Sequence, residues 1–248
     1  MALFAETGHS KNVANFEKLI IYCSGMGDSY NPSRKGLLIE SMQSQLSASR
    51  KSVLLINDLL PAYKTAVAER IQAFKELESL VNKINNALKA SGASNEMQAS
   101  VQTIIRKLRG KRATPKKTDE QKKEAMESGK EIIEISSSQM SYDNRLNNLH
   151  KLIKQLSNIT EYSPNEKDLQ LKALEGTYNQ LSTKNKAVIT ANMPLSNARI
   201  ERNKLLYSEN EGLIDIANGV KSYIKSIFGA ASPQYKQLTN LKFTNASN

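Results

Sequence analysis

Apolar residues recur every seven positions through residues 33–90, a stretch interrupted by a single proline. One row consists of Ile39, Leu46, Val53, Leu60, Val67, Phe74, Val81 and Leu88. A second row, offset by three, consists of Met42, Ser49, Ile56, Tyr63, Arg70, Leu77 and Ile84. Two such rows are typical of a long helix packed lengthwise on other helices. Unbroken, this helix would extend about 85 Å.

The ends and the middle of this helix have their own signals. Asn31 is a good N-cap residue, and Pro32 suits the first helical position because its missing N–H has no partner there in any case. Pro61 lies inside the pattern and predicts a kink. A helical hairpin that reverses near Pro61 is the alternative interpretation.

The second half of the chain echoes the first at a displacement near 132 residues. The matched segments are Lys18-Leu19-Ile20 with Lys151-Leu152-Ile153, Tyr30-Asn31-Pro32 with Tyr162-Ser163-Pro164, Lys51-Ser52-Val53 with Lys186-Ala187-Val188, Pro61 with Pro194, and Glu69-Arg70 with Glu201-Arg202. Ordered matches of helix-breaking residues favour an internal duplication. The alternative is two similar amphipathic helices that arose independently.

The sequence therefore predicts an all-α protein, an elongated antiparallel bundle of very long, proline-kinked amphipathic helices in two similar units. The first unit covers residues 1–110, with helices at 11–23, 33–90 and 95–109. A basic linker and short helix cover 111–135, the helix beginning at the capping box of Thr118. The second unit covers 136–248, with helices at 141–157, 165–228 and 233–243. A short extended segment is expected at 131–138.

Composition supports helix throughout, since the chain of 248 residues has only 11 Gly and 6 Pro. The amino terminus does not resemble a secretory signal, and no apolar run is long enough to span a membrane. One cysteine leaves no intramolecular disulfide framework. A cytoplasmic protein without a transmembrane segment is expected, and export without a signal stays open.

Candidate residues for chemistry are few. His9 and His150 are far apart in sequence, and no Cys, His or carboxylate set has metal-ligand spacing. Cys23 is interpreted as a buried structural thiol, and the glycines of Gly25-Met26-Gly27 lack the context of a phosphate loop. Arg70 and Arg202 are expected to pair with carboxylates or to fix the register of the seam, with ligand binding as the alternative. We expect no catalytic residue, cofactor or metal.

Net charge is +11, which raises nucleic acid or an anionic surface as a partner. The positive charge concentrates in one segment without acidic residues, formed by Arg106, Lys107, Arg109, Lys111, Arg112, Lys116 and Lys117. This cluster is a candidate anion or nucleic-acid patch, although aromatic residues for base stacking are absent from it. A solvated linker is the alternative.

Three segments carry a resemblance to a known group of proteins: residues 6–16 (ETGHSKNVANF), residues 138–145 (SQMSYDNR), and residues 232–243 with SPQYK and LKF. They resemble an uncharacterised, entirely helical protein family of Bacteroidota. The resemblance implies a full-length helical domain from a bacterium and no established activity.

These observations predict a non-enzymatic structural or interaction protein, a scaffold or self-assembling component that binds a protein partner or itself. A basic nucleic-acid-associated protein is the alternative. A membrane-active helical protein of the pore-forming-toxin type is a less favoured one, because Asn57, Asp58 and Pro61 interrupt the most apolar segment.

Overall fold

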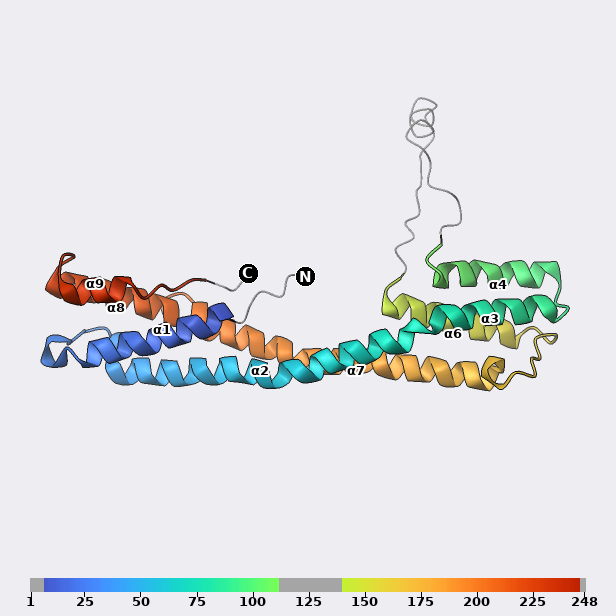
Figure 1. Ribbon diagram of the computed structural model, residues 1–248, viewed down its shortest axis with the longest axis horizontal. Helices are drawn as coiled ribbons and strands as arrows, with labels where there is room; N and C mark the ends of the chain where they lie inside the picture. Colours follow the sequence, from blue (N-terminus) through green and yellow to red (C-terminus); the bar gives the residue numbers. More distant parts are fainter. Residues whose placement is uncertain (1–6, 112–139, 246–248) are drawn as a thin grey trace, which may run out of the picture. The chain divides into compact units, whose positions relative to one another are not determined.

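The computed structural model describes residues 7–111 and 140–245, and every regular element in these ranges is a helix (Figure 1). The all-α prediction is confirmed. The elements are α1 (Thr7–Ser24), η1 (Gly27–Ser29), η2 (Lys35–Leu37), α2 (Ile39–Lys75), α3 (Leu77–Ala90), α4 (Asn95–Leu108), α6 (Tyr142–Ser157), η3 (Lys167–Leu169), α7 (Leu171–Tyr207), α8 (Leu213–Phe228) and α9 (Pro233–Thr239). The segments predicted at 118 and at 131–138 lie outside the described residues.

The first long helix differs from its predicted bounds at both ends. α2 begins at Ile39 and not at Pro32, because the short 3-10 helix η2 occupies the intervening turn. The helix continues through Pro61, so the alternative of a hairpin at this proline is wrong. A break at Glu76 separates α2 from α3, although Glu76 keeps helical backbone angles (φ −82°, ψ −7°).

The second long helix is also shorter than predicted. A single helix was expected at 165–228, whereas α7 ends at Tyr207 and α8 begins at Leu213. Asn210 adopts a positive φ of 65° in the connection, and its N–H donates to the Asp215 carboxylate at 2.8 Å. Pro194 lies inside α7, as Pro61 does in α2.

The seam predicted from the heptads is correct in residue detail. Every position of both rows is buried or half-buried, including the polar Ser49 and Arg70. Met42, Ile56, Ile84 and Leu88 are each 0% exposed. The pattern therefore identified the inward face of α2 and α3 without identifying the helices packed against it.

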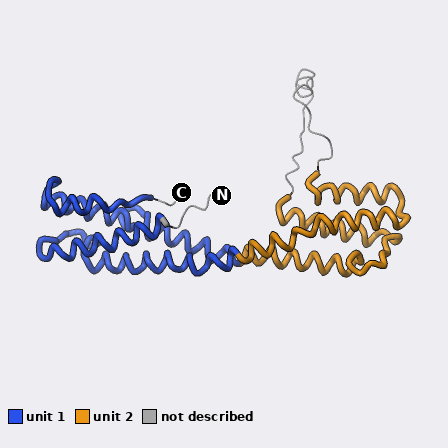
Figure 2. Tube along the Cα trace, viewed as in Figure 1, with its two compact units in different colours: residues 1–64, 191–248 blue, residues 65–190 orange. Residues whose placement is uncertain are grey.

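The chain forms two compact units (Figure 2). Unit 1 comprises residues 1–64 and 191–248, and unit 2 comprises residues 65–190. This division differs from the sequence units 1–110 and 136–248, because α2 and α7 each begin in one compact unit and end in the other. Each compact unit thus combines the first part of one long helix with the last part of the other.

Each unit has its own hydrophobic core. In unit 1, α1 packs on α8, and Phe16 and Leu19 are buried with Val220 and Ile224. In unit 2, α4 packs on α6 and α3, and Phe74 of α2 is among the largest fully buried side chains. Ser94 and Ser141 cap α4 and α6 through their side-chain oxygens, which accept from the N–H groups of Met97 and Asn144.

Candidate functional site

The turn that leads into each long helix is closed by a buried tyrosine. In unit 2 the Tyr162 hydroxyl donates to the Leu169 carbonyl at 3.0 Å, and in unit 1 the Tyr30 hydroxyl donates to the Leu37 carbonyl at 2.7 Å. Tyr162 is 5% exposed and Tyr30 is 8% exposed. Both side chains bring the turn back against the body of their unit and fix the point at which the helix begins.

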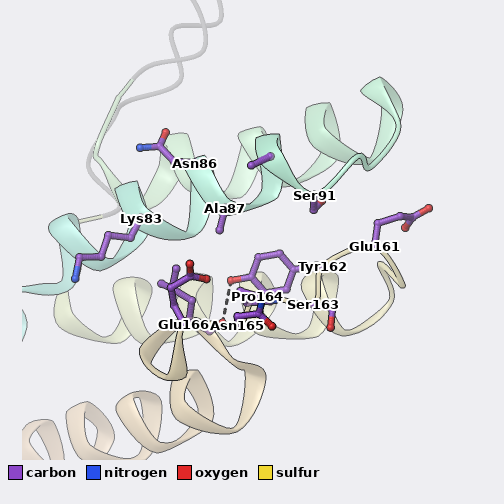
Figure 3. A pocket seen from close by; sticks show the side chains of 12 residues that line it. Lys83, Asn86, Ala87, Ser91, Glu161, Tyr162, Ser163, Pro164, Asn165 and Glu166 are labelled. Atoms are coloured by element: carbon purple, nitrogen blue, oxygen red, sulfur yellow. Dashed lines mark hydrogen bonds between the residues drawn. The ribbon is translucent and has the colours of Figure 1, made fainter.

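A pocket of about 650 Å³ opens beside Tyr162 in unit 2 (Figure 3). The helix α3 contributes one wall with Lys83, Asn86 and Ala87. The opposite wall is the turn before α7, which includes Pro164 and Glu166. Figure 3 shows the Ala87 methyl group facing the turn, with Tyr162 opposite it. A concavity of this size is within the range of small-molecule sites.

Negative charge predominates around this pocket. Glu161 and Glu166 line it, and Lys83, its one basic lining residue, pairs with Asp168 at 3.3 Å. Burial, with further contributions from the Asp168 and Glu166 carboxylates, raises the pKa of Tyr162 to about 12. The Tyr162 hydroxyl is therefore neutral at physiological pH and keeps its hydrogen bond to Leu169.

The corresponding place in unit 1 is filled by a side chain of α8. The Tyr223 ring lies 5.5 Å from the Tyr30 ring at an interplanar angle of 86°. The Tyr223 hydroxyl accepts a hydrogen bond from the Asn31 N–H at 3.1 Å. One turn earlier, Gly219 approaches so closely that an added Cβ would lie 3.2 Å from Leu37 Cδ2.

The predicted basic patch is described only in part. Lys107 and Lys111 are exposed at the end of α4, and Arg106 and Arg109 are half-buried beside them. In the described part of the chain none of these four forms a salt bridge with a carboxylate, and Arg109 Nε is buried without a hydrogen-bond partner. Arg112, Lys116 and Lys117 lie outside the described residues, so the structure brings together four of the seven predicted residues.

Arg70 belongs to a polar network that the sequence indicated only indirectly. Its guanidinium lies 3.9 Å from the centre of the Tyr142 ring and donates to Asn185 Oδ1 at 3.2 Å. Asn185 in turn donates to the Asp143 carboxylate at 2.8 Å. The expected pairing of Arg70 with a carboxylate is thus mediated by an amide. In unit 1, Arg202 donates to Asn203 Oδ1 at 2.8 Å.

A second network, in unit 1, was not found from the sequence. His9 Nδ1 lies 2.6 Å from the Tyr207 hydroxyl, and Asn12 both donates to the Thr244 carbonyl and accepts from the Thr244 N–H. These contacts fix the carboxyl-terminal segment on α1. The buried His9 ring therefore has a structural partner, Tyr207, which lies 198 residues away in sequence.

The cysteine and the glycine loop considered in the sequence have surroundings that fit a structural role. Cys23 is 1% exposed, and burial raises the pKa of its thiol to about 12, which keeps the thiol protonated and unreactive. Gly27, at φ 53°, begins the three-residue helix η1 and not an α-helix that could hold a phosphate. Within residues 7–111 and 140–245, no group of three His, Cys, Asp or Glu side chains could hold a metal ion.

Comparison of the chain with protein-family models, with curated proteins and with solved structures finds no match. Among the described helices, none has both the length and the apolar content needed to cross a membrane.

Proposed function

We propose that this chain is a non-enzymatic structural or interaction protein, built by internal duplication, that associates with itself. The observation that carries the proposal is the apolar exposure on the long helices. Leu54, Leu55, Met193 and Ile200 are large side chains that lie in unit 1 and are between 48% and 63% exposed. Solvent-exposed apolar groups on rigid helices favour association with another protein surface.

Burial along the two long helices supports the duplication. The buried positions of α2 are 42, 49, 53, 56, 66 and 74, and a shift of 132 residues places every one of them on a buried position of α7. Both helices have 37 residues. Two helices that arose independently would share the heptad spacing, but they would have no reason to share the same starting point after a Tyr-x-Pro turn.

The composition of the compact units suggests how the duplication arose. Each unit combines the first part of one repeat with the last part of the other, which is the arrangement of a dimer that exchanges identical elements. We propose that the chain is the fused equivalent of such a dimer. A fused dimer requires no catalytic site, which is consistent with a scaffold.

Met193 and Ile200 provide the most specific candidate for self-association. They are 63% and 61% exposed and lie seven residues apart on α7, so they share one face of the helix. Burying such side chains contributes about 1.5–3 kcal/mol each. An interface that fully buries this pair would be weakened about a hundredfold or more if both were made polar, because the two contributions together exceed about 3 kcal/mol and each 1.4 kcal/mol corresponds to a factor of ten.

Sedimentation velocity over a range of protein concentrations tests this proposal. The unmodified chain should assemble as its concentration rises, and Met193→Ser with Ile200→Ser should shift assembly to higher concentration. The matched control replaces two exposed isoleucines on other helices, Ile21→Ser with Ile227→Ser, and should assemble like the unmodified chain. A chain that stays monomeric throughout, or equal effects of both double variants, would contradict the proposal.

Nucleic-acid binding through the basic cluster is the second candidate. It is favoured by the exposure of Lys107 and Lys111 in the described part of the cluster. Cations in the last turn also stabilise α4 through its dipole, so the same residues have a purely structural explanation. Retention on nucleic acid that falls steeply with salt would separate the two.

Charge reversal makes this test specific. Lys111→Glu, Arg112→Glu, Lys116→Glu and Lys117→Glu together should abolish retention if the cluster binds phosphates. The control reverses four lysines elsewhere, Lys35, Lys51, Lys172 and Lys186. If the control weakens retention to the same extent, binding follows net charge and the cluster has no special role.

A further inference from the structure

The pocket beside Tyr162 can be compared with unit 1 position by position. The buried residues of α3 include Leu77, Val81, Ile84 and Leu88, and a shift of 136 residues places them on the buried Leu213, Ala217, Val220 and Ile224 of α8. The same shift places Ala87 at the position of Tyr223 and Lys83 at the position of Gly219. Contacts agree with this register, because Gly219 faces Leu37 while Lys83 pairs with Asp168, the neighbour of Leu169.

The two units therefore differ in the occupant of one place. In unit 1 a phenol ring from α8 lies across Tyr30, and its hydroxyl accepts from the backbone N–H of the next residue, Asn31. In unit 2 the equivalent side chain is the methyl group of Ala87, and the space beside Tyr162 is a pocket. The residue equivalent to Asn31 is Ser163, which lines this pocket.

We propose that the pocket beside Tyr162 binds a neutral or positively charged phenol group in the place that the Tyr223 side chain occupies in unit 1. The ring of this group lies against Ala87 and the small exposed part of Tyr162, and edge-to-face packing of two aromatic rings is a favoured geometry. Its hydroxyl meets the Ser163 N–H, which donates to the Glu161 carbonyl at 3.0 Å in the structure.

The charges of the pocket select among phenols. Glu161 and Glu166 line it without a basic partner in the described ion pairs, and Lys83 is already paired with Asp168. An amine attached to the ring gains from this field, whereas a carboxylate is repelled. The elevated pKa of Tyr162, which the Asp168 and Glu166 carboxylates help to raise, is consistent with a negative local field.

Saturation-transfer NMR on the full chain tests the proposal with three probes. Tyramine represents a free phenolic amine, N-acetyltyrosinamide represents a tyrosine within a polypeptide, and 4-hydroxyphenylacetate represents a phenolic anion. We expect saturation of the ring protons of tyramine, of N-acetyltyrosinamide or of both, and the stronger of the two identifies the source of the phenol. Binding of the anion as tight as that of tyramine would overturn the charge argument.

Two variants connect binding to this pocket. Ala87→Tyr supplies the ring from α3, as Tyr223 does in unit 1, and should abolish probe binding while the far-ultraviolet circular dichroism is unchanged. The matched control Ala99→Tyr, at an exposed alanine of α4, should bind as the unmodified chain does. Equal binding by both variants, or no saturation of either favoured probe by the unmodified chain, would overturn the proposal.

A third variant keeps the proposal testable if Ala87→Tyr fails to fold. Tyr223→Ala removes the ring in unit 1 and should create a second site, which raises the stoichiometry measured by titration calorimetry from one to two. A stoichiometry that stays at one overturns the inference. The phenol site rests on the proposed duplication and not on self-association. Sedimentation of the same samples therefore shows whether self-association through Met193 and Ile200 fails independently of phenol binding.

Discussion

At the scale of single residues, two tyrosine hydroxyls stabilise the turns that precede the long helices. Tyr30 and Tyr162 each donate to a buried carbonyl seven residues later, Leu37 or Leu169. A buried carbonyl that loses its donor keeps the cost of desolvation without the hydrogen bond. Each tyrosine hydroxyl therefore helps to stabilise the turn before its long helix, together with the backbone hydrogen bonds of that turn.

Tyr162→Phe should lower the free energy of unfolding by about 1–3 kcal/mol, because it leaves the Leu169 carbonyl unpaired in a buried place. Tyr30→Phe should have an effect of similar size in unit 1. Urea denaturation monitored by circular dichroism measures both. The exposed Tyr22→Phe serves as the control, since its side chain is 39% exposed.

The same tyrosine predicts a dependence of stability on pH. The pKa of Tyr162 is raised from 10.0 to about 12 in the folded chain, so folding favours the protonated hydroxyl. Its contribution is present in full below pH 10 and is lost as pH rises from about 10 to about 12. The difference in melting temperature between the unmodified chain and Tyr162→Phe should shrink across this interval; a constant difference would contradict the burial of the hydroxyl.

Phe74 combines several contacts in the core of unit 2. It is 2% exposed, its ring packs on Tyr142 at 4.8 Å, and its carbonyl accepts from Arg145 at 3.1 Å. Phe74→Ala should destabilise by about 3–5 kcal/mol through lost burial and a residual cavity. Lys75→Ala, on the exposed side of the same helix, should change stability little. Equal effects in urea denaturation would show that the seam is misassigned.

At the scale of elements, two glycines in the second long segment have opposite expected roles. Gly212 lies between α7 and α8, where an added Cβ would approach the Ser208 carbonyl oxygen to 2.6 Å. Gly176 lies inside α7 with no atom within 4 Å of an added Cβ. The first is required by a close backbone approach, and the second only weakens a helix.

Gly212→Ala should therefore destabilise by about 1–3 kcal/mol, because backbone atoms must move to accept the methyl group. Gly176→Ala should stabilise by about 0.5–1 kcal/mol through helix propensity. Thermal unfolding of both variants should show a lower melting temperature for Gly212→Ala and a higher one for Gly176→Ala than for the unmodified chain. Stabilisation by Gly212→Ala would mean that the connection between α7 and α8 is not as described.

The sequence predicted the buried faces well and the helix ends less well, for identifiable reasons. Heptad spacing reports directly on burial, so both rows of α2 and α3 were correct. The break at Glu76 has no proline or glycine, and its backbone angles stay helical, so no local signal marks it. The start at Ile39 depends on the 3-10 helix η2, which the tertiary hydrogen bond of Tyr30 to Leu37 stabilises.

The candidate site was beyond sequence reasoning for a different reason. The pocket beside Tyr162 arises from a small residue, Ala87, on the inward side of α3, and an alanine in a helix carries no signal of its own. The role of Ala87 becomes visible only by comparison with Tyr223 of α8, whose ring packs on Tyr30 in unit 1. The basic cluster, in contrast, was visible from charge alone.

At the scale of the whole molecule, we propose that each compact unit combines one part from each of two duplicated repeats. Heptads could not reveal this, because the same seam suits a helix from either repeat. In unit 1, α1 buries Phe16 and Leu19 against α8, which we assign to the second proposed repeat. In unit 2, α4 of the first proposed repeat buries Val101 and Ile105 against α6 of the second proposed repeat.

Separate expression of residues 1–111 and 140–248 tests this claim most directly. Residues 1–111 contain α1 and α4 but lack their packing partners α8 and α6, and residues 140–248 contain α8 and α6 but lack α1 and α4. Neither fragment should therefore fold as a monomer. Mixing the two should give a 1:1 complex, detected by light scattering, that recovers the helical circular dichroism and the cooperative melting of the intact chain. Either fragment alone should be folded only as a dimer that imitates the duplication. A fragment that is a monomer with cooperative thermal unfolding would contradict the account.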